Sequence, residues 1–231
     1  MNAFAPKRVL VSGARGALGS AVVRKYLQMG FQVVGMISHF EKPKEESKRL
    51  LVDAALSWIQ TDITDSKSVR SSLKGEHFDI FVHCAGGFRF GTLEELKDED
   101  LDFLINTNLK SAFYLVRELI PYMKSHNFGR IVFVSTKGTL LPSQGMAAYT
   151  ASKAGLNLLT ACLAEETKKF NITVNSVLPT VSDTPSNREA MADAKFDDWV
   201  TPSDLAEIIF SLTSELGKPI HGSLIPVSGR L

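Results

Sequence analysis

The sequence predicts an α/β fold in which a doubly wound parallel sheet lies between helices in three layers, and two observations support this. Short apolar runs such as residues 9–11 alternate along the chain with longer segments of helical periodicity such as residues 17–29. The run 78–82 is almost continuously apolar, which suits a strand covered by helices on both faces. In such a sheet, a ligand is expected beyond the carboxyl ends of the strands.

The expected elements follow in the order strand, helix, strand, helix, and local residues mark their ends. Asp65 is a suitable N-cap residue for one helix, and Pro202 is suited to the first turn of another. Strands are predicted at 8–12, 33–37, 56–60, 78–82, 130–135, 172–177 and 223–227. Helices are predicted at 17–29, in the charged stretch up to Ala55, and at 65–73, 98–125, 147–170 and 202–214.

Composition favours a single cytoplasmic domain over residues 1–231. No linker divides the chain, and its 231 residues can bury a full α/β core. A net charge of +1 gives no basic field, so nucleic acid is not an expected partner. Cys84 and Cys162 are expected to be small core residues in a reducing compartment. No apolar run reaches the ~20 residues of a membrane span, no signal peptide precedes the first strand, and no histidines have metal-ligand spacing.

The turn after the first strand, residues 12–19, reads S-G-A-R-G-A-L-G. Small residues let the backbone approach a pyrophosphate, and the following helix N-terminus supplies oriented N–H groups with about half a positive charge. The sequence therefore predicts a Rossmann-type dinucleotide site, although an ordinary glycine-rich turn is the alternative. The candidate residues are Gly13, Arg15, Gly16, Ala17, Leu18 and Gly19.

The end of the second strand bears on the choice between NAD and NADP. An acidic residue there would bind both ribose hydroxyls and repel a 2′-phosphate. This strand ends in Ile37, Ser38 and His39, without a carboxylate. Ser38 can hydrogen-bond a phosphate, while Arg15, His39 and Lys42 can add positive charge. NADP is therefore slightly favoured over NAD.

Tyr149 and Lys153 lie four residues apart at the start of a helical pattern, which places both on one helix face. A phenol titrates near pKa ~10, and a neighbouring ammonium is expected to lower that pKa toward neutrality. The pair is a candidate acid/base site. An isolated Y-x-x-x-K is more often an exposed aromatic residue and a solvated lysine. The other motifs of the chain therefore decide whether the pair is an acid/base site.

Together with the glycine turn, these residues resemble the short-chain dehydrogenase/reductase family over nearly the whole chain. The other matching positions are Asp62, Ala85, Gly86, Asn108 and Thr136. The family's N-N-A-G falls on His83, Cys84, Ala85 and Gly86, so both asparagines that brace the central strand are replaced.

The resemblance implies hydride transfer between NAD(P) and a carbonyl or alcohol substrate, with Tyr149 as the acid/base. It also implies that Lys153 lowers the pKa of Tyr149 and holds the nicotinamide ribose, and that Asn108 holds a water. Thr136 stands at the family's catalytic serine and is favoured over Ser135, which should point to the other side of the strand.

The same resemblance assigns further contacts to the cofactor. Asp62 and Ile63 should meet adenine, and Ala85 with Gly86 should pass beneath the cofactor. Pro179 should flank the nicotinamide ring, and Thr184 should reach its carboxamide.

A narrower resemblance is to dihydropteridine reductases, carried mainly by the tail with its L-P at 178–179, D-T-P at 183–185 and G-S-L-I at 222–225. A pterin reductase is therefore the alternative function, and an NAD(P)-binding regulator without turnover is a less favoured third. Unlike that subfamily, this chain lacks an acidic residue after the second strand and has both Thr136 and Asn108.

Residues 180–201 are the expected substrate lid, with Met191, Phe196 and Trp199 as apolar candidates and a packed flap as the alternative. Lys137 can contact an anionic substrate. By the family resemblance, helices 98–125 and 147–170 are expected to form a homodimer or homotetramer.

Overall fold

The computed structural model describes residues 7–38 and 53–230. The strands are β1 (Arg8–Ser12), β2 (Gln32–Ile37), β3 (Leu56–Gln60), β4 (Ile80–His83), β5 (Gly129–Val134), β6 (Ile172–Pro179) and β7 (Leu224–Val227). The α-helices are α1 (Ala17–Gln28), α3 (Ser66–Ser72), α4 (Asp98–Ile105), α5 (Ser111–Ser125), α6 (Ala147–Thr167), α7 (Pro185–Ala190) and α8 (Pro202–Thr213). Each predicted strand is present, with its ends within two residues of the prediction. The helix predicted up to Ala55 falls mainly on residues 39–52, outside the described residues.

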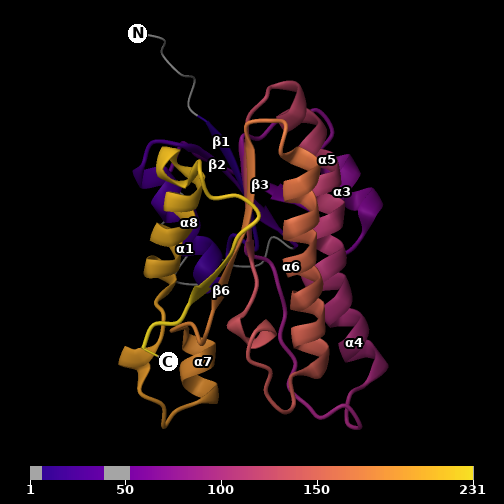
Figure 1. Cartoon of the computed structure of the whole chain (residues 1–231), viewed down its shortest axis with the longest axis vertical. Helices are drawn as coiled ribbons and strands as arrows, with labels where there is room; N and C mark the ends of the chain where they lie inside the picture. Colours follow the sequence, from indigo (N-terminus) through magenta and orange to yellow (C-terminus); the bar gives the residue numbers. More distant parts are fainter. Residues whose placement is uncertain (1–6, 39–52, 231) are drawn as a thin grey trace.

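Within the described ranges, the strands form one seven-stranded sheet in the order β3-β2-β1-β4-β5-β6-β7. Every neighbouring pair is parallel. Helices α1 and α8 cover one face, and α3, α5 and α6 cover the other (Figure 1). This arrangement confirms the predicted doubly wound sheet in three layers.

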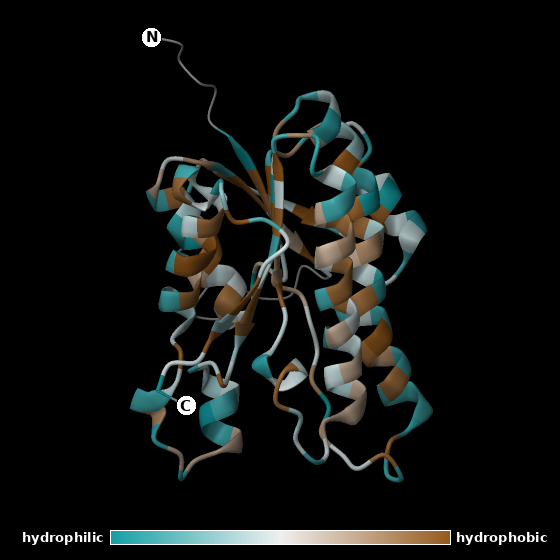
Figure 2. Ribbon diagram, viewed as in Figure 1, coloured by the Kyte–Doolittle hydropathy of each residue, from teal (hydrophilic) through white to brown (hydrophobic). Residues whose placement is uncertain are grey.

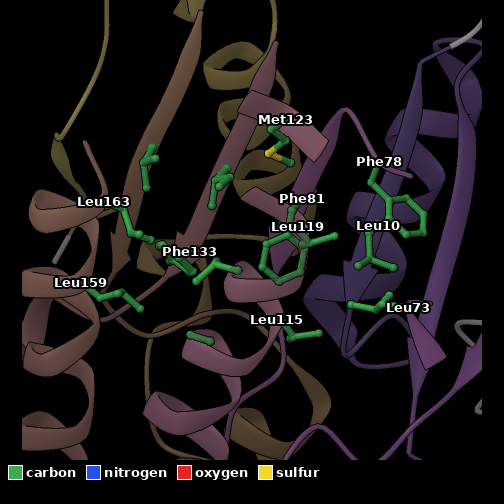
Figure 3. Packing of buried hydrophobic residues seen from close by; sticks show 14 of the residues in the cluster. Leu10, Leu73, Phe78, Phe81, Leu115, Leu119, Met123, Phe133, Leu159 and Leu163 are labelled. Atoms are coloured by element: carbon green, nitrogen blue, oxygen red, sulfur yellow. The ribbon is translucent and has the colours of Figure 1, made fainter. Parts of the chain in front are cut away.

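Alternation along the strands divides the core between the two faces of the sheet. Leu10 packs with Phe81 and Phe133 beneath α5 and α6 (Figure 3). Val9 and Val11, one residue to either side of Leu10, belong to the opposite cluster with α1 and α8. The strands between the helix layers are accordingly apolar along most of their length (Figure 2), as expected for a sheet buried on both faces.

The predicted helix 98–125 is wrong in one respect, because a π-helical turn, η2 (Asn106–Lys110), separates α4 from α5. The hydroxyl of Ser111 donates to the carbonyl of Thr107 at 2.6 Å within this region. A π turn widens the helix locally but does not interrupt the apolar periodicity of the sequence, so the pattern predicts one continuous helix. It is also the turn that carries Asn108, which is fully buried.

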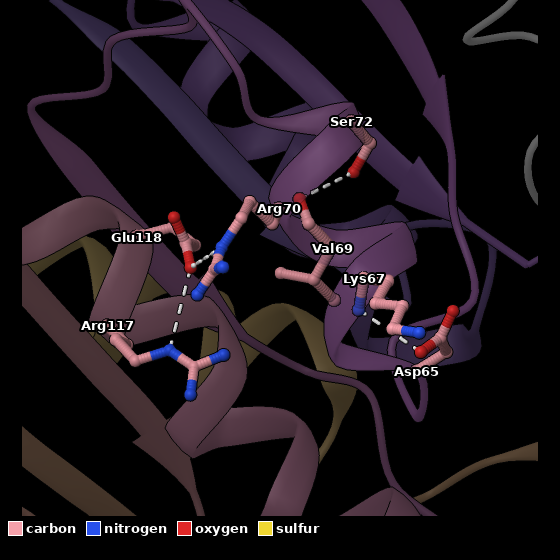
Figure 4. Close-up of polar contacts among 7 residues, drawn as sticks. All are labelled: Asp65, Lys67, Val69, Arg70, Ser72, Arg117 and Glu118. Carbon is pink, nitrogen blue, oxygen red and sulfur yellow. Dashed lines mark hydrogen bonds and ion pairs between the residues drawn. The ribbon is translucent and has the colours of Figure 1, made fainter.

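Helix α3 is attached to α5 by both apolar and charged contacts (Figure 4). Asp65 caps α3 as predicted, accepting from the N–H groups of Lys67 and Ser68, each at 3.1 Å. Arg70 of α3 pairs with Glu118 of α5 at 3.3 Å. Since Arg70 is exposed, that ion pair contributes little, and burial of the Val69 side chain contributes more.

The two cysteines differ in their surroundings. Burial raises the pKa of the Cys84 thiol to about 12. Cys162 is exposed on α6, so the expectation that it is a core residue is wrong. The helical pattern of α6 includes apolar residues on its outer face, which a single sequence does not distinguish from the inner face. Across residues 7–38 and 53–230, no helix combines the length and apolarity needed to cross a membrane.

Candidate active site

The glycine turn closes tightly against the loop after β4. Gly13 has φ +64°, and a Cβ added there would lie 2.8 Å from the backbone N and Cα of Ala85. A Cβ on Gly19 would lie 2.1 Å from the carbonyl oxygen of Gly13, so only glycine lets α1 start this close to the turn. The N-cap residue of α1 is Gly16, which has no side chain to accept from the first N–H groups of the helix. Its first N–H groups therefore face the turn in the way that suits a phosphate.

A cavity of about 410 Å³ opens beside this turn at the carboxyl ends of the strands. It brings together eight of the predicted cofactor residues: Gly13, Arg15, Gly16, Ser38, Asp62, Ile63, Ala85 and Gly86. Ala17, Leu18, Gly19, Pro179 and Thr184 do not line it. Phe103 and Thr107 do line it, although their only sequence signal was their place on the predicted helix before Asn108.

The end of the cavity near β2 carries hydroxyl and guanidinium groups. The Arg15 guanidinium lies over the Trp58 ring, 5.0 Å from its centroid. Ser38 is exposed, and its carbonyl accepts from Gln60 Nε2 at 3.5 Å. Oδ1 of Asp62 accepts from the backbone N–H and the hydroxyl of Thr64 at 2.8 and 2.7 Å, which fixes the loop after β3. His39 and Lys42 lie outside the described residues.

Tyr149 and Lys153 lie in the first two turns of α6, and burial dominates the electrostatics of both. Lys153 Nζ donates to the carbonyl of Val134 at 2.8 Å, and burial lowers the pKa of Lys153 to about 8. Burial raises the pKa of Tyr149, opposed by a side-chain hydrogen bond with Thr136. The expectation that Lys153 lowers the pKa of Tyr149 is therefore wrong for this structure. Desolvation of the phenolate outweighs it, and Lys153 is directed to Val134.

The hydroxyls of Ser135 and Thr136 point in opposite directions at the end of β5. Ser135 donates to the carbonyl of Lys153 at 3.3 Å, on the backbone of α6. Thr136 bonds with Tyr149 and accepts from the N–H of Gly138 at 3.2 Å. Of the two candidates, only Thr136 meets the tyrosine.

Asn108 ties the loop after β4 to α6. Its Oδ1 accepts from the N–H of Gly87 at 2.7 Å. Its Nδ2 donates to the carbonyl of Gly87 and to Ser152 Oγ, each at 3.0 Å. A Cβ on Gly86 would lie 3.0 Å from Asn108 Oδ1 and 3.1 Å from Lys153 Nζ. Glycine at 86 therefore lets the loop pass close to both polar side chains.

Two aromatic residues that were not predicted as site residues lie near α6: Phe88 contacts Tyr149, and Phe90 contacts Gly145. The Phe88 ring packs edge-to-face on Tyr149 at 4.9 Å between centroids, although the side chain is 50% exposed. Phe90 is 72% exposed and covers Gly145, whose added Cβ would lie 2.6 Å from its ring. The available sequence signal was the position of the two phenylalanines, one and three residues after the pair Gly86-Gly87. A neighbouring cavity of about 280 Å³ is lined by Thr136, Lys137, Gly138, Leu141, Met146, Thr180 and Val181.

Residues 180–201 contain α7 and the short helical turn Phe196–Asp198. Ser182 bridges to Val200, and Trp199 is buried with its ring 4.9 Å from that of Phe196. Thr184 caps α7 by accepting from the N–H of Asn187 at 3.2 Å. Pro179 ends β6 opposite Val227.

Comparisons with known proteins agree with this geometry. A family model described as short chain dehydrogenase matches residues 7–195. The 3-oxoacyl-acyl-carrier-protein reductase FabG of Rickettsia conorii is 33% identical over 233 residues, covering 96% of this chain and 95% of that protein. Dihydropteridine reductase of Dictyostelium discoideum is 32% identical over 227 residues, covering 95% of this chain and 93% of that protein. A solved oxidoreductase of the short chain dehydrogenase/reductase family from Burkholderia thailandensis has a TM-score of 0.87 at 27% identity, covering 97% of this chain and 92% of its own.

Proposed function

Since this chain belongs to the short-chain dehydrogenase/reductase family and is an NAD(P)-dependent oxidoreductase, we propose that Tyr149 is the acid/base for hydride transfer between nicotinamide and a carbonyl substrate. The observation that carries this proposal is the hydrogen bond between the side chains of Tyr149 and Thr136 beside the dinucleotide cavity. A carbonyl oxygen placed between these hydroxyls would receive a proton from Tyr149 as hydride reaches its carbon. The Thr136 hydroxyl would stabilise the developing alkoxide.

Lys153 and Asn108 have supporting roles in this proposal. The Lys153 ammonium is buried next to Gly86 and would bind the ribose of the nicotinamide. Asn108 would hold the loop beneath the cofactor through Gly87 and support the proton path from Lys153 through a water. Pro179 and Thr184 would approach the nicotinamide from the flap side, with 180–201 acting as a substrate lid on a single domain, residues 1–231.

NADP is the proposed cofactor. The described part of the loop after β2 is Ser38, where a carboxylate would favour NAD by repelling a 2′-phosphate. Ser38 and Arg15 line the same cavity and supply a hydroxyl and a positive charge. The remaining proposed cofactor contacts are Gly13, Gly16, Ala17, Leu18, Gly19, Asp62, Ile63, Ala85 and Gly86.

The first substrate to test is a 3-oxoacyl thioester, since a 3-oxoacyl reductase covers nearly the whole chain at 33% identity. Acetoacetyl-CoA with NADPH should be reduced by the wild-type protein, as read from loss of NADPH absorbance. Absence of NADPH consumption with acetoacetyl-CoA and with simple ketones would reject carbonyl reduction.

A pterin reductase is the second candidate, favoured by the 32% identity to the Dictyostelium dihydropteridine reductase. An assay with quinonoid dihydropterin and NADH or NADPH tests it directly. The variant Tyr149→Phe distinguishes the two candidate activities. It should impair ketone reduction more than reduction of a quinonoid ring, which depends less on an acid.

Assembly and location are further parts of the proposal. A groove of about 830 Å³ runs between α5 and α6, and its rim includes the exposed Phe113, Leu158 and Cys162. An apolar face of this kind supports a homodimer or homotetramer built through these helices. The free thiols of Cys84 and Cys162 support a reducing compartment such as the cytoplasm.

A further inference from the structure

The ring of His83 lies fully buried at the carboxyl end of β4, between two segments that border the cofactor cavity. Its Nδ1 is 2.8 Å from Oγ of Ser12, the last residue of β1. Its Nε2 is 3.2 Å from Oγ of Ser111, the first residue of α5. The central strand therefore has a polar brace, although both asparagines of the family pattern are replaced.

The other partners of the two serines fix the direction of each hydrogen bond. Ser111 donates its only proton to the carbonyl of Thr107 at 2.6 Å, so it must accept from His83, whose Nε2 carries the hydrogen. Ser12 accepts from the N–H of Ala85 at 3.3 Å and donates to the unprotonated Nδ1 of His83. The neutral Nε2–H tautomer is the form that satisfies every donor and acceptor in this chain of bonds.

Within residues 7–38 and 53–230, the only charged group recorded as acting on the ring is Lys153, which disfavours a positive charge. Phe81 and Phe133 pack beside the ring, at 5.8 and 6.1 Å between centroids. Burial lowers the pKa of His83 to about 3, and the charge on Lys153 contributes to this shift. His83 is therefore neutral throughout the ordinary pH range, and the direction of the bonds is constant.

We propose that His83 is a positioning residue that couples the loop beneath the cofactor to the π-helical turn carrying Asn108. The ends of its hydrogen-bond chain, Ala85 and Thr107, both line the cofactor cavity. Asn108 follows Thr107 and binds both backbone groups of Gly87, two residues after Ala85. These hydrogen bonds and the intervening backbone form a closed ring around Gly86, which we call the His83 circuit. The link from His83 to cofactor binding follows from family membership, whereas its link to turnover rests on the proposed function.

Two conservative substitutions each remove one of the two hydrogen bonds that His83 makes. In His83→Asn, the side-chain amide lies near the former Nδ1 and can accept from Ser12, but it does not reach Ser111. In His83→Gln, the amide reaches Ser111 and can donate to it, while Ser12 loses its acceptor. The first variant therefore keeps the half that holds Ala85, and the second keeps the half that holds the π turn.

The variants should affect binding and turnover differently. For His83→Gln, the NADPH dissociation constant from fluorescence titration should rise about threefold to tenfold, as expected for one net hydrogen bond, with kcat changed less than about twofold. For His83→Asn, kcat with whichever of acetoacetyl-CoA or quinonoid dihydropterin is turned over should fall about threefold to tenfold, with the dissociation constant changed less than about twofold. A purely structural role predicts no such split.

Thr160→Val is the matched control. It removes a buried hydrogen bond between Thr160 and Ser176, 2.7 Å long, away from the cofactor cavity. This variant should lower the thermal midpoint without changing the NADPH dissociation constant. The proposal would be overturned if both His83 variants had the same NADPH dissociation constant and the same kcat as Thr160→Val.

A measurement on the wild-type protein does not depend on variants that fold. Long-range proton–nitrogen NMR of the imidazole should show His83 neutral with hydrogen on Nε2 at neutral pH. Hydrogen on Nδ1, or a charged ring, would contradict the His83 circuit. Failure of the protein to turn over either substrate would reject the proposed function, while the tautomer and the NADPH dissociation constants would still decide the role of His83.

Discussion

Ser135 and Thr136 are adjacent, yet their hydroxyls serve opposite sides of the strand end. Ser135 donates to the backbone of α6 at Lys153, 3.3 Å away, whereas Thr136 is bonded to the side chain of Tyr149. Only one of the two can therefore contact a substrate oxygen that also meets Tyr149.

Thr136→Ala should lower kcat on the order of 100-fold, because it removes a donor to the developing alkoxide. Ser135→Ala is the matched control and should reduce thermal stability with little change in kcat. Steady-state kinetics with the active substrate and NADPH measure both effects, and Thr136→Ser should restore most of the activity. A larger loss of kcat in Ser135→Ala than in Thr136→Ala would contradict the assignment.

Tyr149→Phe should lower kcat for a ketone about 100-fold to 10,000-fold, because the proton donor is lost. NADPH binding should persist in this variant, since the tyrosine does not line the dinucleotide cavity. Titration of NADPH fluorescence separates the two quantities. Full activity of Tyr149→Phe on the ketone would reject Tyr149 as the acid.

Ser38→Asp should weaken NADPH binding at least about tenfold, because a carboxylate at this position repels the 2′-phosphate. NADH binding should be unchanged or tighter, since the carboxylate can accept from the ribose hydroxyls. Ser125→Asp places the same charge on an exposed residue at the end of α5 and should change neither affinity. Tighter NADH than NADPH binding by the wild-type protein would reverse the proposed cofactor preference.

Leu158→Glu should convert the assembled protein to a smaller species. Leu158 is 69% exposed on α6 beside the groove that also includes Phe113, and a carboxylate there would be desolvated in an interface. Light scattering reads the mass in solution. Leu216→Glu, at a residue that is 82% exposed and outside this groove, should leave the mass unchanged. A wild-type monomer would exclude assembly through this face.

His83 should make the protein sensitive to acid. Its pKa falls from 6.5 to about 3 on folding, so between these values the unfolded chain binds a proton that the folded chain does not. The contribution of His83 is fully present above about pH 6.5 and is lost toward about pH 3, by about 1.4 kcal/mol per pH unit. Urea denaturation at several pH values in this range gives the free energy of unfolding as a function of pH. That free energy should rise less steeply with pH for His83→Asn than for the wild-type protein. Equal slopes would show that His83 does not contribute.

The order of strands and helices along the chain and most of their ends follow from the sequence, because short apolar runs, Asp65 and Pro202 are local signals. The glycine turn likewise places Gly13 and Gly16 at the cavity by local geometry. The π-helical turn did not follow, since its backbone geometry leaves no trace in the apolar periodicity. The pKa directions at Tyr149 and the polar partners of His83 also did not follow. Both depend on tertiary burial and on contacts among residues far apart in the chain.

The π-helical turn between α4 and α5 has a consequence for insertions and deletions. Each residue of an α-helix turns the chain by about 100°. Deleting one residue between 106 and 110 would allow α4 and α5 to join as one regular helix, but would rotate the segment before the deletion by about that angle relative to α5. Leu104, which is buried on α4, would then leave the core. Length variation is therefore expected to be less tolerated in this turn than in the exposed loop at residues 93–97.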